Sequence, residues 1–172
     1  MATTASGTAQ VGPVRLSLSY KVIWGLAALG TSLIAGTYGA LLPIFYQDYL
    51  GLQARWIAIG AAIYAVWNAI NDPALGVLID RFRYRPDRGK YVYIMRVTAP
   101  VTVLAALAMV FAQPSWEEWL IFAFMLILLF IYDTTHTAFS IAHAAYIYVA
   151  APTNEERVDV FVYTTYIAHV GG

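Results

Sequence analysis

Four long apolar segments restrict this chain to a membrane-spanning helical fold. The segments cover about residues 22–46, 56–79, 91–111 and 120–149. A helix needs about 20 apolar residues to cross a bilayer core about 30 Å thick, and each segment is long enough. Hydrophobic residues make up 60% of the sequence and charged residues 12%, whereas soluble proteins average roughly 45–50% apolar and about 25% charged. The sequence therefore predicts an all-α fold, a polytopic transmembrane helix bundle.

The two ends of the sequence differ from these segments. A fifth apolar segment, residues 157–172, forms a helix only about 24 Å long, which is short of a full crossing. It is either a tilted, incomplete helix or part of a fragment. Residues 1–16 are small, polar and uncharged before Arg15, and they lack the basic start of a signal peptide. We expect a disordered cytoplasmic tail over 1–16 and a transmembrane bundle over 17–172, with four full helices and a partial fifth.

The basic residues collect on one side of the predicted bundle. Nine of the ten Lys and Arg residues lie there: Arg15, Lys21, Arg81, Arg83, Arg85, Arg88, Lys90, Arg96 and Arg157. The opposite side carries Arg55 together with Asp48, Glu117 and Glu118. Because cytoplasmic loops of membrane proteins are enriched in Lys and Arg, we expect an integral protein of the plasma (inner) membrane with a cytoplasmic N-terminus.

Composition and motifs argue against several classes of function. The sequence contains ten basic and ten acidic residues, so its net charge gives no indication of a nucleic-acid partner. It contains no cysteine, which excludes disulfides and thiolate metal sites. It shows no phosphate-binding loop and no convincing metal-ligand spacing. We therefore expect no enzymatic activity, no metal centre and no cofactor, and the lipid bilayer as a partner.

The second apolar segment contains a row of polar residues. At about 100° per residue, four side chains fall within an arc of about 100° on one helical face: Tyr64, Asn68, Asn71 and Asp72. An ionisable group at membrane depth costs at least about 2.5–3.5 kcal/mol, so Asp72 should be paired, protonated or facing a cavity. Pro73 frees the carbonyl of Ala69 and adds an oxygen beside the row. These oxygens suit a hard cation or a proton, unless the row is a structural cluster that joins helices.

The fourth segment carries a second polar row. Its members fall within an arc of about 120° on one face: Asp133, His136, Thr137, Ser140 and His143. Asp133 is a candidate second carboxylate, or else a capping or water-facing residue near the outer interface. The two histidines are candidates for proton relay or ligand binding, or else buried residues that are merely hydrogen-bonded.

The stretch "WNAINDPALGVLIDR" at residues 67–81 resembles the helix-two signature W-D-A-I-N-D-P-x-x-G of the glycoside–pentoside–hexuronide:cation symporters. This melibiose permease-like family belongs to the major facilitator superfamily. Three further stretches, "LSYKVIWGLAALGTS", "FYQDYLGL" and "NEERV", resemble other parts of the family's N-terminal half. The resemblance covers about residues 17–165 and implies the N-terminal part of a major-facilitator-type fold.

The resemblance also implies a site, with departures from the family's pattern. The cation or proton site falls on Asp72, Asn68, Asn71 and Thr137, and Asn68 replaces a family aspartate. Ser32 and Ser140 stand where sugar-binding members carry aspartates, and no arginine is present near Thr164. The site is therefore expected to be degenerate. The candidate residues of the substrate cavity are Ser32, Tyr64, Asp133, His136, Ser140 and His143.

The loop after the second segment has the pattern Gly76-x-x-x-Asp80-Arg81. It resembles the cytoplasmic gating loop of the major facilitator superfamily, in which the glycine allows close helix contact and the charged pair gates the cytoplasmic side. The alternative is an ordinary basic cytoplasmic loop.

Two functional hypotheses follow from these features. In the first, the chain is the N-terminal portion of a secondary transporter, which moves a sugar-like solute with Na⁺ or a proton and needs a C-terminal half as partner. In the second, it is a non-transporting accessory or structural transmembrane subunit that binds other membrane protein subunits through its apolar helix faces.

Overall fold

The structure is a computed structural model that describes residues 15–82, 89–151 and 153–169. In this part of the chain every regular element is helical. The elements are α1 (Leu18–Ile44), the π-helical turn η1 (Phe45–Tyr49), α2 (Ala54–Arg81), α3 (Lys90–Ala108), the 3₁₀ turn η2 (Met109–Phe111), α4 (Glu118–Ala150) and α5 (Asn154–His169).

Four helical stretches are long and apolar enough to cross a membrane. They are Leu18–Tyr49, Ala54–Arg81, Lys90–Phe111 and Glu118–Ala150. The fifth helix, α5, has 16 residues, which is about 24 Å and short of a full crossing. The prediction of an all-α transmembrane bundle with four full helices and a partial fifth is therefore confirmed.

Two of the helices, α1 and α5, begin earlier than the predicted apolar segments because a capping residue precedes each of them. The side chain of Ser17 accepts a hydrogen bond from the backbone N–H of Tyr20, so α1 begins at Leu18 and not near residue 22. Thr153 similarly accepts from the N–H of Glu156 before α5. Most of the predicted disordered tail, residues 1–14, lies outside the described residues. Leu16, assigned to that tail, instead packs against a buried cluster around Trp24.

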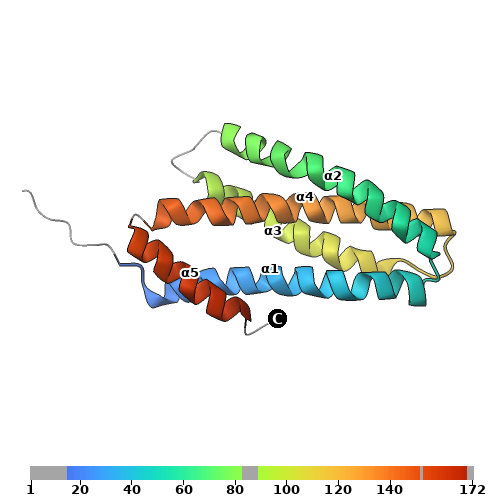
Figure 1. The fold of residues 1–172 in the computed structure, drawn as a ribbon, viewed down its shortest axis with the longest axis horizontal. Coiled ribbons are helices and arrows are strands. Elements are labelled where there is room, and N and C mark those ends of the chain that lie inside the picture. The colour runs from blue at the N-terminus through green and yellow to red at the C-terminus, as the bar shows by residue number, and fades with distance from the viewer. Residues whose placement is uncertain (1–14, 83–88, 152, 170–172) are drawn as a thin grey trace, which may run out of the picture.

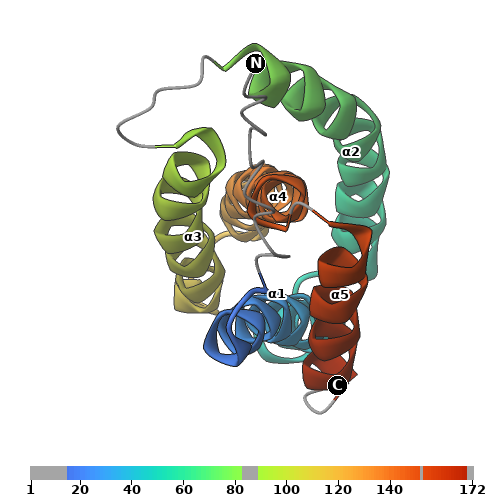
Figure 2. The same cartoon turned by 90° about the vertical axis from the view of Figure 1, so that its left-hand side faces the viewer.

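The helix α4 lies at the centre of the bundle, and the other helices surround it (Figure 2). Figure 1 shows that α1 and α3 begin, and α2 and α4 end, at the same end of the molecule, where α5 also begins. The helices pack mainly in three pairs: α3 with α4, α1 with α5, and α2 with α4. Polar residues midway along α2 and α4 therefore come together inside the bundle.

The far end of the bundle is closed by a compact apolar cluster. Tyr46 on η1 is fully buried with Leu52 and Ile121, and its hydroxyl donates to the carbonyl of Met109 at 2.9 Å. The chain turns there through Gly51, whose φ of 73° is a left-handed conformation that favours glycine. Large apolar side chains elsewhere are exposed, as lipid-facing helices require: Leu26, Val66, Ile70, Leu104 and Ile127 are examples.

Candidate functional site

The centre of the bundle contains a buried carboxylate that is bonded across two helices. Asp133 lies near the middle of α4 and is only 6% exposed. Its Oδ1 accepts from the hydroxyl of Tyr64 at 2.7 Å, and its Oδ2 accepts from the Asn71 side-chain amide at 3.1 Å. The hydroxyl of Thr134 then donates to the Asn71 Oδ1 at 3.3 Å. We call Tyr64, Asn71, Asp133 and Thr134 the central polar layer.

The sequence places these groups together through helical periodicity and a close helix crossing. Tyr64 and Asn71 are seven residues apart, which is about two turns, so they share one face of α2. The same helix approaches α4 closely at Gly60, where an added Cβ would lie 3.3 Å from side-chain atoms of Phe122 and Met125. Small residues permit such crossings in membrane bundles.

Asp133 has no basic partner in the described part of the chain. The ion pairs found in residues 15–82, 89–151 and 153–169 join Lys21 to Glu156 and Asp159, and Arg55 to Glu118. The sequence alternative that Asp133 is a capping or water-facing residue near the outer interface is wrong, because the residue is buried near mid-helix. An ionised carboxylate at this depth favours any positive charge that can reach it.

The four predicted ion-site residues occupy different surroundings. Asn71 is buried and belongs to the central polar layer, whereas Asp72 is exposed and Asn68 and Thr137 are half-buried. Among the described residues, neither Asp72, Asn68 nor Thr137 forms a side-chain hydrogen bond. The structure therefore brings Asn71 to α4 and leaves Asp72 on the open face of α2. Ion binding at these four residues stays a prediction.

The remaining cavity candidates divide between α4 and α1. His136 and His143 each have a buried Nε2 atom without a hydrogen-bond partner in the described residues. His143 stacks on Trp24 with ring centroids 3.8 Å apart, and His136 lines a cavity of about 120 Å³ between α1, α3 and α4. Ser140 is half-buried and Ser32 is exposed. Neither serine is joined to the central polar layer by a hydrogen bond.

The predicted gating residues lie at the end of α2. Asp80 and Arg81 are exposed, and Lys90 Nζ donates to the Asp80 backbone carbonyl at 3.2 Å. The expectation that Gly76 allows close helix contact is wrong for the described residues, because a Cβ there would meet nothing within 4 Å. The helices approach closely at Gly25 and Gly60 instead. The rest of the loop, residues 83–88, lies outside the described part.

Sequence reasoning missed Thr134, which completes the central polar layer. It also missed the link between α3 and α4, where Thr102 Oγ1 lies 2.9 Å from Thr135 Oγ1. The available signal was the run Asp133-Thr134-Thr135 in an otherwise apolar helix. Three polar residues in succession point in different directions around a helix, so one such run can bond to two neighbouring helices.

Comparisons with known proteins agree with this architecture. A family model described as "MFS/sugar transport protein" matches residues 23–172. The chain is 25% identical over 160 residues to "Uncharacterized symporter YnaJ" of Bacillus subtilis, covering 92% of this chain and 34% of that protein. It is 30% identical over 106 residues to a "Putative 2,3-dihydroxypropane-1-sulfonate exporter" of Salmonella typhimurium, covering 61% of this chain and 22% of that protein.

A third relative, also from Salmonella typhimurium, is a "Putative sulfoquinovose importer". It is 30% identical over 93 residues, which cover 54% of this chain and 20% of that protein. The chain thus spans about a third or less of the length of the curated relatives that it matches. No solved structure matches it significantly.

Proposed function

Because this chain belongs to the MFS/sugar transport protein family, we propose that it is the N-terminal portion of a secondary transporter for a sugar-like solute. The family is one of transporters, and the chain is an integral membrane protein. The observation that carries the proposal is the central polar layer, a buried carboxylate bonded between two membrane-spanning helices. Such groups within membrane helices mark ion and substrate pathways.

The proposed role of the layer is to bind the coupling ion. Asp133 supplies one negative charge, the Tyr64 hydroxyl and the Asn71 amide nitrogen donate to it, and the Thr134 hydroxyl adds a further oxygen next to Asn71. One carboxylate with neutral oxygens suits one positive charge, which is a proton or Na⁺. Asp72, on the open face of α2, supplies a second carboxylate beside the same helices. Loading the ion removes the unfavourable charge between α2 and α4, and releasing it restores that charge.

The proposed solute is a neutral, sugar-like polyol. Ser32 and Ser140 offer hydroxyls where charged sugar-binding residues are expected from the family pattern. On α2 and α4 the basic side chains away from the helix ends are His136 and His143, and the exposed Arg96 lies in the second turn of α3. An organosulfonate, as named for two relatives, is better held by Arg or Lys. We therefore expect the site to bind neutral sugars more tightly than sulfonates.

A second proposal is an accessory transmembrane subunit without transport. The exposed Asp72 favours it, because a carboxylate on an open face of a membrane helix needs a donor from a neighbouring helix. In both proposals the end that carries Lys90 and Arg157 faces the cytoplasm of a plasma (inner) membrane.

Melting of the purified protein in detergent separates the two proposals. Wild type is compared with Asp133→Asn, Asp72→Asn and the control Asp48→Asn, which changes an exposed residue of η1. A coupling site predicts that Na⁺ or acidification raises the melting temperature of wild type and the control, and that Asp133→Asn abolishes this response. A wild type that responds to neither ion favours the accessory subunit.

A further inference from the structure

Arg96 is a charged side chain in the apolar part of α3. It lies in the second turn, six residues after Lys90, which places its Cα about 9 Å from the start of the helix. The side chain is exposed, and α3 contains no acidic residue that could neutralise it. A charge at membrane depth is unfavourable unless it reaches a partner or the membrane surface, so Arg96 is a candidate binding residue.

Other basic residues at the same end of the bundle are held by the fold, whereas Arg96 is not. Lys90 donates to the backbone carbonyl of Asp80 at 3.2 Å, and Arg157 donates to that of Ala151 at 2.8 Å. Among the residues that the structure describes, no ion pair includes Arg96. Its charge therefore does not help to pack the described helices against one another and is available to a partner outside them.

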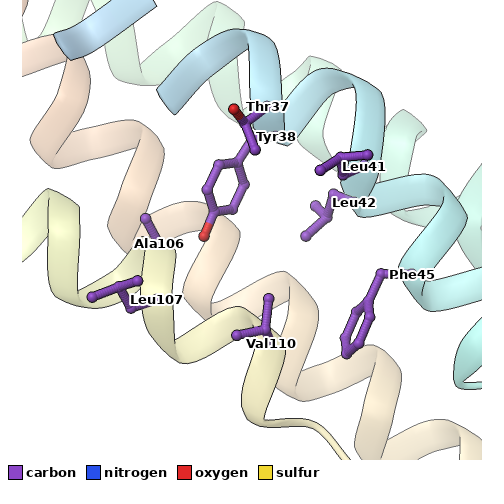
Figure 3. A pocket seen from close by; sticks show the side chains of 8 residues that line it. All are labelled: Thr37, Tyr38, Leu41, Leu42, Phe45, Ala106, Leu107 and Val110. Atoms are coloured by element: carbon purple, nitrogen blue, oxygen red, sulfur yellow. The ribbon is translucent and has the colours of Figure 1, made fainter. Parts of the chain in front are cut away.

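Arg96 belongs to a row of exposed side chains on α3. At about 100° per residue, four apolar residues fall with Arg96 in an arc of about 100°: Pro100, Val103, Leu104 and Leu107. We call Arg96 and these four residues the outer row. The opposite face of α3 contains the buried Ile94 and Ala105 and packs on α4. Leu107, at the far end of the row, borders an open groove between α3 and α1, so α1 leaves the row uncovered (Figure 3).

The direction of α3 brings the Arg96 guanidinium towards the membrane surface. Side chains on a helix tilt towards its N-terminus, and α3 begins at the end of the bundle that carries Lys90 and Arg157 (Figure 1). A long basic side chain lays its apolar stem along the helix and keeps its charge near the interface. Tyr93, one turn nearer that end, is 41% exposed and adds a hydroxyl donor.

We propose that Arg96 binds the phosphate of an anionic phospholipid, with Tyr93 as a second donor and an acyl chain along the outer row. A guanidinium pairs with phosphate through two parallel hydrogen bonds, and exposed apolar side chains suit an acyl chain. Anionic lipids give the cytoplasmic leaflet its negative surface potential. The choice of leaflet therefore rests on the orientation proposed above, but the inference does not depend on the ion or the solute.

Melting of the native-length protein in detergent tests the choice of lipid, and this measurement does not depend on orientation. Phosphatidylglycerol should raise the melting temperature of wild type by several degrees more than phosphatidylcholine does. Arg96→Gln should remove this difference, and Arg96→Lys should keep part of it, because lysine retains the charge without the paired donors. The control Arg15→Gln removes an exposed charge at the same end and should keep the full difference.

Two outcomes of this measurement overturn the proposal. The first is an equal effect of the two lipids on wild type. The second is a preference for phosphatidylglycerol that Arg96→Gln leaves unchanged. Because Arg96 is exposed, both of its variants should melt at the wild-type temperature without added lipid.

A soluble phosphate distinguishes a lipid site from a site for a free anion. Glycerol 3-phosphate carries the phosphate without acyl chains, so it should leave the melting temperature of wild type unchanged. A rise as large as that with phosphatidylglycerol would overturn the assignment to a lipid.

Spin labelling in bilayers tests whether lipid covers the outer row. Residues 1–172 contain no cysteine, so a single label can be placed once any cysteine elsewhere in the native-length protein is replaced. Val97→Cys lies next to Arg96 at a position that is 48% exposed. Its label should be accessible to oxygen, which dissolves in lipid, and protected from a water-soluble nickel complex. The control label at the exposed Gln113 should be accessible to the nickel complex. A Val97 label protected from both reagents would mean that protein covers this face, which overturns the proposal.

Discussion

The direction of a single side chain decides which carboxylate of this chain is held inside the bundle. Asn71 is buried and bonds to Asp133, whereas Asp72, the next residue, is exposed. Adjacent residues point about 100° apart on a helix, so both could not face α4. The sequence predicts the polar row but not which of its edges faces α4. Asn71 and Asp72 lie at opposite edges of the row, about 100° apart, so the helix can turn only one of them towards α4.

At the same scale, Tyr64→Phe tests the bond that orients Asp133. The phenol donates to Oδ1 of this carboxylate at 2.7 Å, and hydrogen bonds to charged groups contribute about 1.5–3 kcal/mol. We expect a lower melting temperature, by several degrees, than for the control Tyr166→Phe, which changes a residue that is 73% exposed. Equal melting temperatures for the two variants would contradict the assigned bond.

Gly60→Leu tests the close approach of α2 to α4. An added Cβ at Gly60 already lies 3.3 Å from Phe122 and Met125, so the larger side chain displaces α2. Overpacking of this kind costs about 1–3 kcal/mol. The matched control is Gly76→Leu on the same helix, where the space is open. Gly60→Leu should have a lower melting temperature than Gly76→Leu. Equal melting temperatures would mean that α2 and α4 do not approach closely at Gly60.

At the scale of helices, apolar length predicts each membrane segment well because the bilayer fixes it. The ends are predicted less well, since polar residues such as Ser17 and Thr153 cap helices outside the apolar segments. The pairing of Lys21 with Glu156 and Asp159 was not predicted. It depends on α5 packing beside α1, and nothing local in the sequence brings these distant residues together.

The sidedness of the helices is a prediction at this scale. Two exposed residues are suitable for single-cysteine labelling: Asn154, at the start of α5, and Gln113, between η2 and α4. The basic end of the bundle should face the cytoplasm, so an impermeant thiol reagent added outside intact cells should label Gln113→Cys and spare Asn154→Cys. Labelling of both from outside would overturn the predicted orientation.

At the scale of the whole molecule, the chain is one part of a larger transport system in our account. Its relatives are somewhat less than three times its length, and major-facilitator transporters work by rocking two halves around a midplane site. The central polar layer lies where such a site is needed, midway along α2 and α4. The fold alone does not distinguish a coupled transporter from an accessory subunit, because both need the same packed helices.

The most direct measurement is ion movement in proteoliposomes that contain the protein in its native length. The account predicts that a neutral sugar from a test panel drives proton or Na⁺ entry through wild type and through Asp48→Asn. Asp133→Asn should abolish this movement while it inserts and folds normally. Ion movement by Asp133→Asn at the wild-type rate would contradict the account, as would a wild type that moves neither ion with any sugar.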